Sequence, residues 1–190
     1  MYVLPPAKYS NGIFTRVLRL GSDKLVRVSI TSKGTVDRPK LSVFTHSHSD
    51  LDKTDEKEIV EKISIMFSLD DDLDEFYSLA NEDPVLRHVK NDLCGLKIQT
   101  SPTFFEGMII GFCLVWTSFQ RAVSIIDGLV REFGLRFGAE YGFPSAKELA
   151  NASVDKLKEL RLGFRAERIK RFSTQVVEGN LFGLYEYAKK

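Results

Sequence analysis

The feature that most constrains the fold of this chain is a long stretch of apolar residues at helical spacing. Its apolar side chains recur at steps of three and four residues, the period of one α-helical face. They are Phe105, Met108, Ile109, Phe112, Cys113, Trp116, Phe119, Val123, Ile126, Val130 and Phe133. The first part is apolar on nearly every side, which predicts the central helix of a bundle. Residues 116–118 could divide the stretch into two helices.

Further helices are predicted on both sides of this stretch. Ser101-Pro102 is expected to begin the central helix, with the serine as its cap. Ser145 and Glu148 have the spacing of a capping box, and Ser153 can cap a short helix. After a turn at Gly163, residues 165–177 form a basic amphipathic pattern, in which Glu167 and Arg171 have ion-pair spacing. The whole region after residue 83 is therefore predicted to be helical.

The N-terminal part has a different pattern. Residues 12–20, 24–31 and 40–45 alternate between apolar and polar side chains and are separated by short turns, which predicts an antiparallel sheet. A helix capped by Thr54 or Asp55 follows, Ser68 interrupts it, and residues 69–77 start a second helix. We predict an α+β fold: a small sheet domain with a helix over residues 1–82, then a helical domain over residues 83–190.

Composition is that of an ordinary soluble protein, with 43% hydrophobic and 28% charged residues. The apolar run from Met108 to Trp116 is too short to cross a bilayer. The first six residues lack the basic and apolar regions of a signal peptide. A cytoplasmic protein without a membrane partner is expected, with Cys94 and Cys113 reduced and buried.

The net charge of +1 hides a segregation of charges along the chain. Residues 1–45 carry eight Lys and Arg against two Asp, and residues 50–83 carry thirteen acids against three Lys. From residue 155 the balance is again basic, with nine Lys and Arg against five acids. The two basic ends could present one face to a polyanion such as nucleic acid, or they could be solvated surfaces without a partner.

Two polar clusters invite a metal interpretation. His46, His48 and Asp50 resemble the HxHxDH loop of metallo-β-lactamase-type hydrolases, but Leu51 stands where the last histidine is needed. A zinc hydrolase is thus a third-ranked hypothesis, and an exposed polar loop is the ordinary explanation. Residues 70–74 carry four aspartates without the spacing of a calcium loop, and the start of a helix accounts for them. No metal or other cofactor is predicted.

Three segments resemble the helix-hairpin-helix DNA glycosylases, in the branch of 3-methyladenine glycosylase II and 8-oxoguanine glycosylase. Residues 69–77 with Asp83-Pro84-Val85-Leu86 are similar to the family's LxxDLxxFYxxxxxDPxL segment. Residues 105–134 are similar to FE…CGQQTSFKRA…LxxxFG, and residues 143–169 to FPS…LGLGYRAxYI. The segments follow the family's order and span most of residues 69–183. The small N-terminal sheet suits the accessory domain that the resemblance implies.

One departure from the family pattern concerns the base-reading position. The family's Gln-Gln, which helps to read or fill the gap at a damaged base, aligns with Val115-Trp116, and Leu114 precedes it. Apolar bulk thus replaces polar readers. Trp116 could stack on a flipped base or wedge into the duplex, or it could be a core residue of a buried helix.

A second departure concerns the catalytic residues. In the family a phosphate-binding hairpin (LPGxGxxxA) and a catalytic aspartate come later in the chain, and residues 179–190 contain neither. No catalytic residue can therefore be assigned here. The candidate DNA or base contacts are confined to the middle stretch and the basic helix: Val115, Trp116, Thr117, Ser118, Arg165, Arg168 and Arg171.

The leading hypothesis is the N-terminal portion of a DNA base-excision repair glycosylase that removes alkylated or oxidised bases, inactive as the 190-residue chain alone. Its implied partner is double-stranded DNA with a damaged base. The alternative is a non-catalytic DNA- or protein-binding module derived from the glycosylase fold. In either case a second chain or self-association would cover apolar surface on the helical domain.

Overall fold

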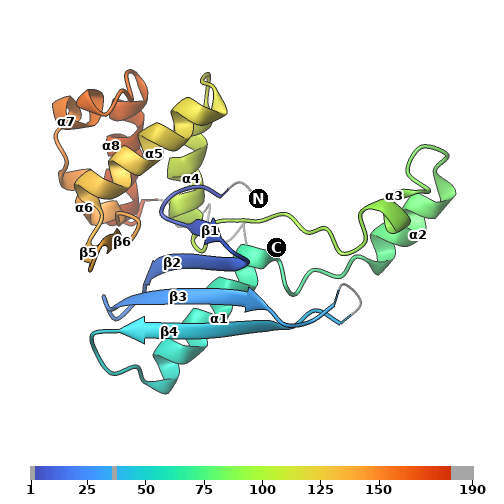
Figure 1. Cartoon of the computed structure of the whole chain (residues 1–190). Coiled ribbons are helices and arrows are strands. Elements are labelled where there is room, and N and C mark those ends of the chain that lie inside the picture. The colour runs from blue at the N-terminus through green and yellow to red at the C-terminus, as the bar shows by residue number, and fades with distance from the viewer. Residues whose placement is uncertain (1–2, 36–37, 181–190) are drawn as a thin grey trace.

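A four-stranded antiparallel sheet and a helical bundle form the body of the protein (Figure 1). The computed structural model describes residues 3–35 and 38–180. The sheet has the order β1-β2-β3-β4. Its strands are β1 (Lys8–Ser10), β2 (Ile13–Arg19), β3 (Leu25–Ser32) and β4 (Leu41–Ser47). The three strands predicted from alternation are confirmed, and the short β1 edge strand is an addition to them.

One face of the sheet packs on helix α1 (Lys53–Phe67) because β3 alternates cleanly. Val26, Val28 and Ile30 are buried on that face and form a core with Ile59 and Ile63 of α1. Asp52 caps α1, because its side chain accepts from the backbone N–H groups of residues 54 and 55; the cap thus lies two or three residues before the positions suggested by sequence. The helix ends at residue 67 with Ser68 in the left-handed conformation, as the predicted interruption requires.

Asp55 is the third residue of α1, and its carboxylate has partners both within the helix start and in the turn after β2. Its carboxylate lies 2.5 Å from the Lys24 ammonium and accepts from the Ser22 hydroxyl at 2.8 Å. These partners, Lys24 first, hold the pKa of the Asp55 carboxyl below its usual range. The reciprocal bond from the Asp52 N–H to Asp55, at 3.1 Å, completes a capping box. The contacts of Asp55 with Ser22 and Lys24 tie α1 to the turn after β2.

The second core belongs to the helical region. Helix α4 (Phe104–Leu114) lies at its centre, next to α5 (Phe119–Phe133) and α8 (Arg165–Val177). The short helices α6 (Ala146–Asn151) and α7 (Val154–Glu159) close the bundle against α8. Fully buried Ile109, Ile126, Leu129 and Ile169 hold these helices together. The predicted division of the apolar stretch into two helices is confirmed.

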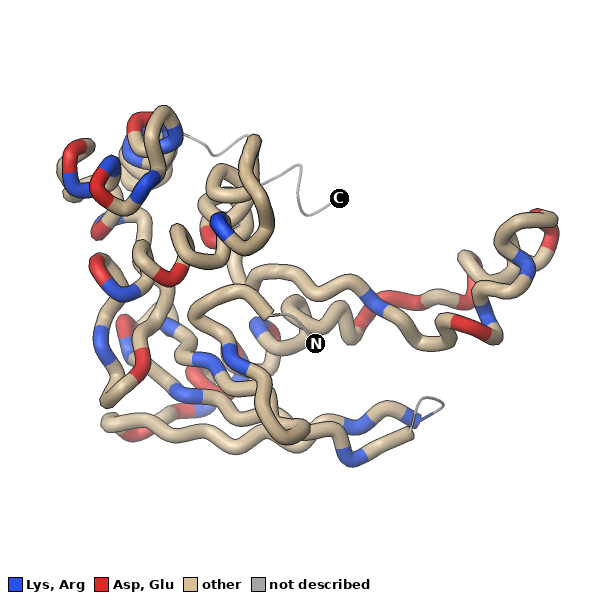
Figure 2. Tube along the Cα trace, turned by 45° about the horizontal axis from the view of Figure 1, so that its top comes forward, with Lys and Arg blue, Asp and Glu red and all other residues tan. Residues whose placement is uncertain are grey.

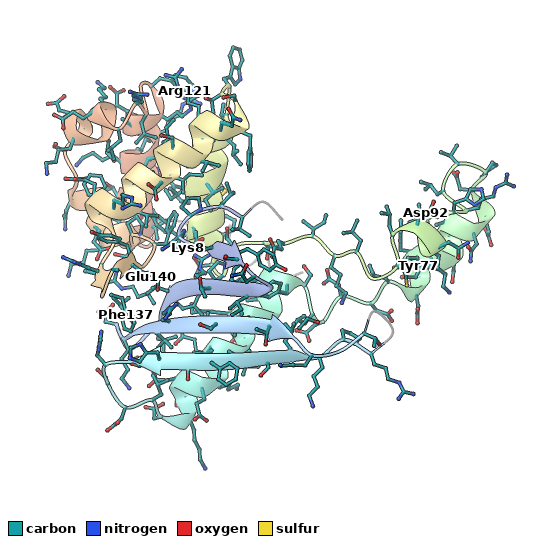
Figure 3. The ribbon with its side chains drawn as sticks, viewed as in Figure 1. Lys8, Tyr77, Asp92, Arg121, Phe137 and Glu140 are labelled. Atoms are coloured by element: carbon teal, nitrogen blue, oxygen red, sulfur yellow. The ribbon has the colours of Figure 1, made fainter. Side chains whose placement is uncertain are left out.

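The helical region also contains a small hairpin, which corrects the expectation of an all-helical second half. Strands β5 (Arg136–Phe137) and β6 (Glu140–Tyr141) pair across a turn at Gly138, whose φ of +61° favours glycine. Glu140 of this hairpin forms ion pairs with Lys8 and Arg27 of the sheet, at 3.5 and 2.9 Å. The hairpin therefore contacts the sheet on the face opposite α1, and Figure 3 labels Lys8 and Glu140 close together at this contact.

Helices α2 (Asp74–Glu82) and α3 (Val89–Asp92) stand apart from both cores and form an arm (Figure 1). Acidic residues mark the arm in Figure 2, and Asp72 and Asp83 accept backbone N–H groups at its turns. Several large apolar side chains of the arm are exposed: Phe76, Leu79, Val85, Leu86, Leu93, Leu96 and Ile98. The domain boundary predicted between residues 82 and 83 falls within the arm and remains a prediction.

A buried ion pair joins the two cores. Arg16 of β2 lies on the α1 side of the sheet and donates to both carboxylate oxygens of Glu106, in the first turn of α4, at 2.5 Å. Both side chains are almost completely buried. Burial raises the pKa of the Glu106 carboxyl, and the Arg16 guanidinium opposes that rise. The pair fixes the start of α4 against the sheet.

The start of α4 differs from the sequence expectation. Thr103, not Ser101, caps the helix by accepting from the Glu106 N–H at 3.2 Å. Ser101 and Pro102 belong to the extended segment that leads from the arm into the body.

Among the residues that the structure describes, no helix is both long and apolar enough to span a membrane.

The Arg16–Glu106 pair predicts a large asymmetry between single and double replacements. Arg16→Met leaves a buried carboxylate unpaired, so the free energy of unfolding should fall by about 3–5 kcal/mol. Arg16→Met combined with Glu106→Leu should recover most of that loss, because no buried charge then remains. Urea denaturation measures both. Lys156→Met, at an exposed ion pair with Glu132, is the control and should cost at most about 1 kcal/mol. If Arg16→Met lowered the free energy of unfolding no more than Lys156→Met does, the assignment of Arg16 and Glu106 as a buried ion pair would be contradicted.

Candidate nucleic-acid interface

The candidate interface is the loop of residues 115–117, which connects α4 to α5. Helix α4 ends at Leu114, and Ser118 caps α5 by accepting from the Arg121 N–H at 3.4 Å. Three residues therefore make the whole connection, and the chain reverses direction across it. Arg121 lies at this end of the bundle, remote from the sheet (Figure 3).

Trp116 is the exposed tip of this loop. Its side chain is 93% exposed, which rules out the core position that helical spacing also allowed. Its φ of +53° lies in the left-handed region, which costs a non-glycine residue on the order of 1–3 kcal/mol. Leu114 and Val115 beside it are also partly exposed. The chain thus keeps its only tryptophan in water and in a strained backbone conformation.

Arg165 of α8 holds the loop from behind. Its Nε donates to the Val115 carbonyl at 3.0 Å, and its Nη2 donates to the same oxygen and to the Trp116 carbonyl at 3.1 Å. Hydrogen bonds from a charged donor contribute about 1.5–3 kcal/mol each, enough to offset the strain at Trp116. The Arg165 side chain is buried, so its hydrogen bonds to the loop are shielded from solvent.

An aromatic and cationic surface continues from the loop onto α8. The exposed ring of Phe164 carries the guanidinium carbons of Arg165 and Arg168 at 4.7 and 5.2 Å from its centroid. Arg168 and Arg171 are exposed, and no ion pair is recorded for either among the described residues. Glu167, expected to pair with Arg171, lies 3.3 Å from Lys158 instead. Phe164 was not singled out by sequence, although an aromatic residue between a turn glycine and a basic helix was the available signal.

The seven predicted contact residues thus fall into groups. Val115, Trp116 and Arg165 are brought together by hydrogen bonds, and Arg168 joins them through Phe164. Ser118 is a helix cap, Thr117 is partly buried in the loop, and Arg171 lies farther along α8. Whether any of them contacts DNA remains a prediction.

The histidine cluster has a packing role in the structure. The rings of His46 and His48 lie 5.6 Å apart, and both contact the Phe137 ring of the β5–β6 hairpin, at 5.5 and 4.4 Å. In residues 3–35 and 38–180 no three His, Cys, Asp or Glu side chains come together as a metal site. The zinc-hydrolase hypothesis therefore gains no support.

The chain is similar in sequence and in fold to known DNA glycosylases. No family model matches the chain. The DNA-3-methyladenine glycosylase of Bacillus subtilis (strain 168) is 27% identical over 157 residues, which are 80% of this chain and 50% of that protein. A 3-methyladenine DNA-glycosylase from Archaeoglobus fulgidus superposes on 90% of this chain and 60% of its own, with a TM-score of 0.75 and 23% identity. The chain is a homologue of the Bacillus subtilis glycosylase over part of that protein's length, and it shares the fold of the Archaeoglobus fulgidus protein.

The fold is also similar to that of an 8-oxoguanine glycosylase/lyase. The Clostridium acetobutylicum 8-oxoguanine glycosylase/lyase, solved with double-stranded DNA containing cytosine opposite 8-oxoguanine, has a TM-score of 0.60 and 14% identity. That match covers 94% of this chain and 67% of the relative. The family resemblance read from sequence is confirmed. The chain spans about half the length of the curated relative that it matches.

The two cysteines differ in a way that thiol chemistry can test. Cys113 is buried in α4 directly behind the loop, and this burial raises the pKa of its thiol to about 12, whereas Cys94 on the arm is exposed, contrary to expectation. At pH 8 a thiol reagent should therefore modify one cysteine of the native chain quickly and the second only after denaturation. Cys94→Ser should abolish the fast phase. Fast modification of both thiols would contradict the packing of α4.

Proposed function

We propose that this chain supplies the sheet domain and the first helices of a DNA base-excision glycosylase. The whole protein would flip an alkylated or oxidised base out of the duplex and hydrolyse its glycosidic bond. Within this chain, the α4–α5 loop and the exposed face of α8 would form part of the DNA contact surface. The support is the homology to 3-methyladenine DNA glycosylases together with the geometry of the loop.

The observation that carries this proposal is the state of Trp116. A large aromatic side chain that is 93% exposed gains nothing from folding, and its left-handed backbone costs stability. The exposure of the ring and the strain of its backbone are both explained if the ring contacts a partner. A nucleic-acid base, either flipped out or beside a gap in a duplex, is a suitable partner for the Trp116 ring, because any base can stack on an aromatic side chain. The position also aligns with the gap-reading residues that the family resemblance implies.

Replacement of Trp116 tests this assignment. Trp116→Ala should weaken binding to a duplex with an abasic-site analogue by about 1–3 kcal/mol, roughly 5- to 150-fold, because the loss of one stacked base contact has this size. Electrophoretic shift or anisotropy of labelled DNA measures it. Phe44→Ala removes an aromatic ring that is 65% exposed on the distant sheet and should leave the affinity unchanged. Equal effects of the two variants would count against a role for the loop.

The activity of the 190-residue chain is a separate question. The family resemblance assigns it no catalytic carboxylate, so we expect no release of base from duplexes that contain 3-methyladenine, hypoxanthine or 8-oxoguanine. Product analysis after alkaline cleavage or by mass spectrometry measures this. The Bacillus subtilis relative provides the positive control for 3-methyladenine. Multiple turnovers by this chain would show that catalytic groups lie among its own residues.

A second candidate, a binding module that acts through another chain, is favoured by the arm. An apolar hollow of about 580 Å³ lies between the arm and the body, lined in part by Leu41, Phe67, Leu73, Tyr77 and Leu96. The outer apolar residues of α2 and the following turn are exposed as well. Clustered apolar exposure of this kind is typical of an interaction surface, and a second chain or another copy would cover it.

Association through the arm is measurable by sedimentation velocity. The 190-residue chain should self-associate as its concentration rises, and Leu79→Lys should shift it toward monomer because the charge opposes burial of α2. Val60→Lys is the matched control, since Val60 of α1 is similarly exposed, 67% against 64% for Leu79, but lies away from the arm. A chain that stays monomeric up to its solubility limit would contradict self-association through the arm.

A further inference from the structure

The guanidinium of Arg165 is buried, and each of its three nitrogens donates to a backbone carbonyl. Nε and Nη2 donate to the carbonyls of Val115 and Trp116, and Nη1 donates to the Leu162 carbonyl at 3.4 Å. The residue is 7% exposed. All three nitrogens of the planar fork therefore have acceptors inside the protein, so a phosphate would have to displace hydrogen bonds that already exist.

The loop has little else to hold it. No backbone–backbone hydrogen bond outside the helices ties residues 115–117 to the rest of the described chain. The Trp116 side chain, 93% exposed, adds almost no packing. A left-handed residue persists only where its surroundings determine it, and in the described chain Arg165 supplies the side-chain hydrogen bonds to this loop.

We propose that Arg165 is a positioning residue, which presets the α4–α5 loop so that Trp116 is already presented before any partner arrives. Arg165 itself does not contact DNA; the exposed Arg168 on the next turn of α8 does. This reassigns one of the DNA-contact candidates suggested by sequence. The part that concerns loop order stands on the structure of the free chain, and the part that concerns affinity rests on the proposed function.

Presetting has a quantitative consequence. When only a fraction of a protein has the competent conformation, its apparent affinity falls by that fraction. If loss of Arg165 leaves the loop competent for about one tenth of the time, the apparent affinity for DNA falls about tenfold. That loss acts through Trp116, whereas a lost phosphate contact acts through charge and lowers the salt dependence of binding by about one unit per contact.

The free chain offers a direct readout because Trp116 is its only tryptophan. Time-resolved fluorescence anisotropy of the indole should show a larger fast component in Arg165→Met than in the unchanged chain. Arg168→Met is the matched control: it removes the same charge from the same helix, beside the same Phe164 ring, and should leave the decay unchanged. Should Arg165→Met not fold, Arg165→Lys keeps the charge but loses the planar fork and should change the decay in the same direction. An unchanged decay in a folded Arg165 variant would overturn the proposal.

Binding to an abasic-site duplex separates positioning from contact. Arg165→Met should lose about tenfold in affinity with an unchanged salt slope, and the loss should largely vanish in a Trp116→Ala background. Arg168→Met should instead lower the salt slope by about one. An Arg165→Met variant that lowers the slope and keeps its full effect without Trp116 would make Arg165 a phosphate contact and refute the positioning role. If the chain binds no DNA at all, the proposed function fails, and the anisotropy of the free chain still decides whether Arg165 orders the loop.

Discussion

The buried ion pair between Arg16 and Glu106 is the interaction on which the arrangement of the molecule depends. It joins the middle of β2 to the first turn of α4, where both side chains are almost completely buried and the two charges face each other with two hydrogen bonds. Helix α4 is the centre of the bundle, and its far end carries the α4–α5 loop. The pair therefore sets where that loop lies relative to the sheet.

An arginine from another element contacts each end of α4. Arg16 from the sheet holds the N-terminal end through a carboxylate, and Arg165 from α8 holds the segment after the C-terminal end through carbonyls. Between them, Ile109 and Cys113 are fully buried. A buried helix with an exposed tryptophan after its end is a suitable support for the DNA contact that we propose for this side chain.

Much of this arrangement follows from local sequence patterns. The alternation in residues 24–31 predicts β3, and the capping box at Ser145 and Glu148 begins α6 as expected. Capping was harder to predict where several candidates stood together. Thr103 caps α4 although Ser101 precedes a proline, and the residue whose N–H it accepts, Glu106, is also the one paired with Arg16 of the sheet. Short strands such as β5 and β6 carry too few residues for a periodic signal.

Tertiary contacts decided the features that sequence left open. Trp116 continues the helical spacing of α4, and periodicity alone allows it to be core; the exposed position follows from Arg165, which lies 49 residues away in sequence. The burial of Arg165 could not be read from a basic amphipathic pattern, which makes its arginines look equivalent. The arm illustrates the opposite limit: Leu79 and Val85 have an apolar pattern, yet within the described residues no core covers them.

The central claim is that the α4–α5 loop contacts DNA, and the fluorescence of Trp116 on titration with duplex tests it most directly. The duplex should carry an abasic-site analogue, and a fluorophore-free binding assay such as calorimetry should measure the affinity in parallel. Our account predicts that the indole emission is quenched as stacking occurs and saturates at the dissociation constant obtained independently. Saturated binding with an unchanged emission would place the DNA elsewhere on the molecule and contradict the account.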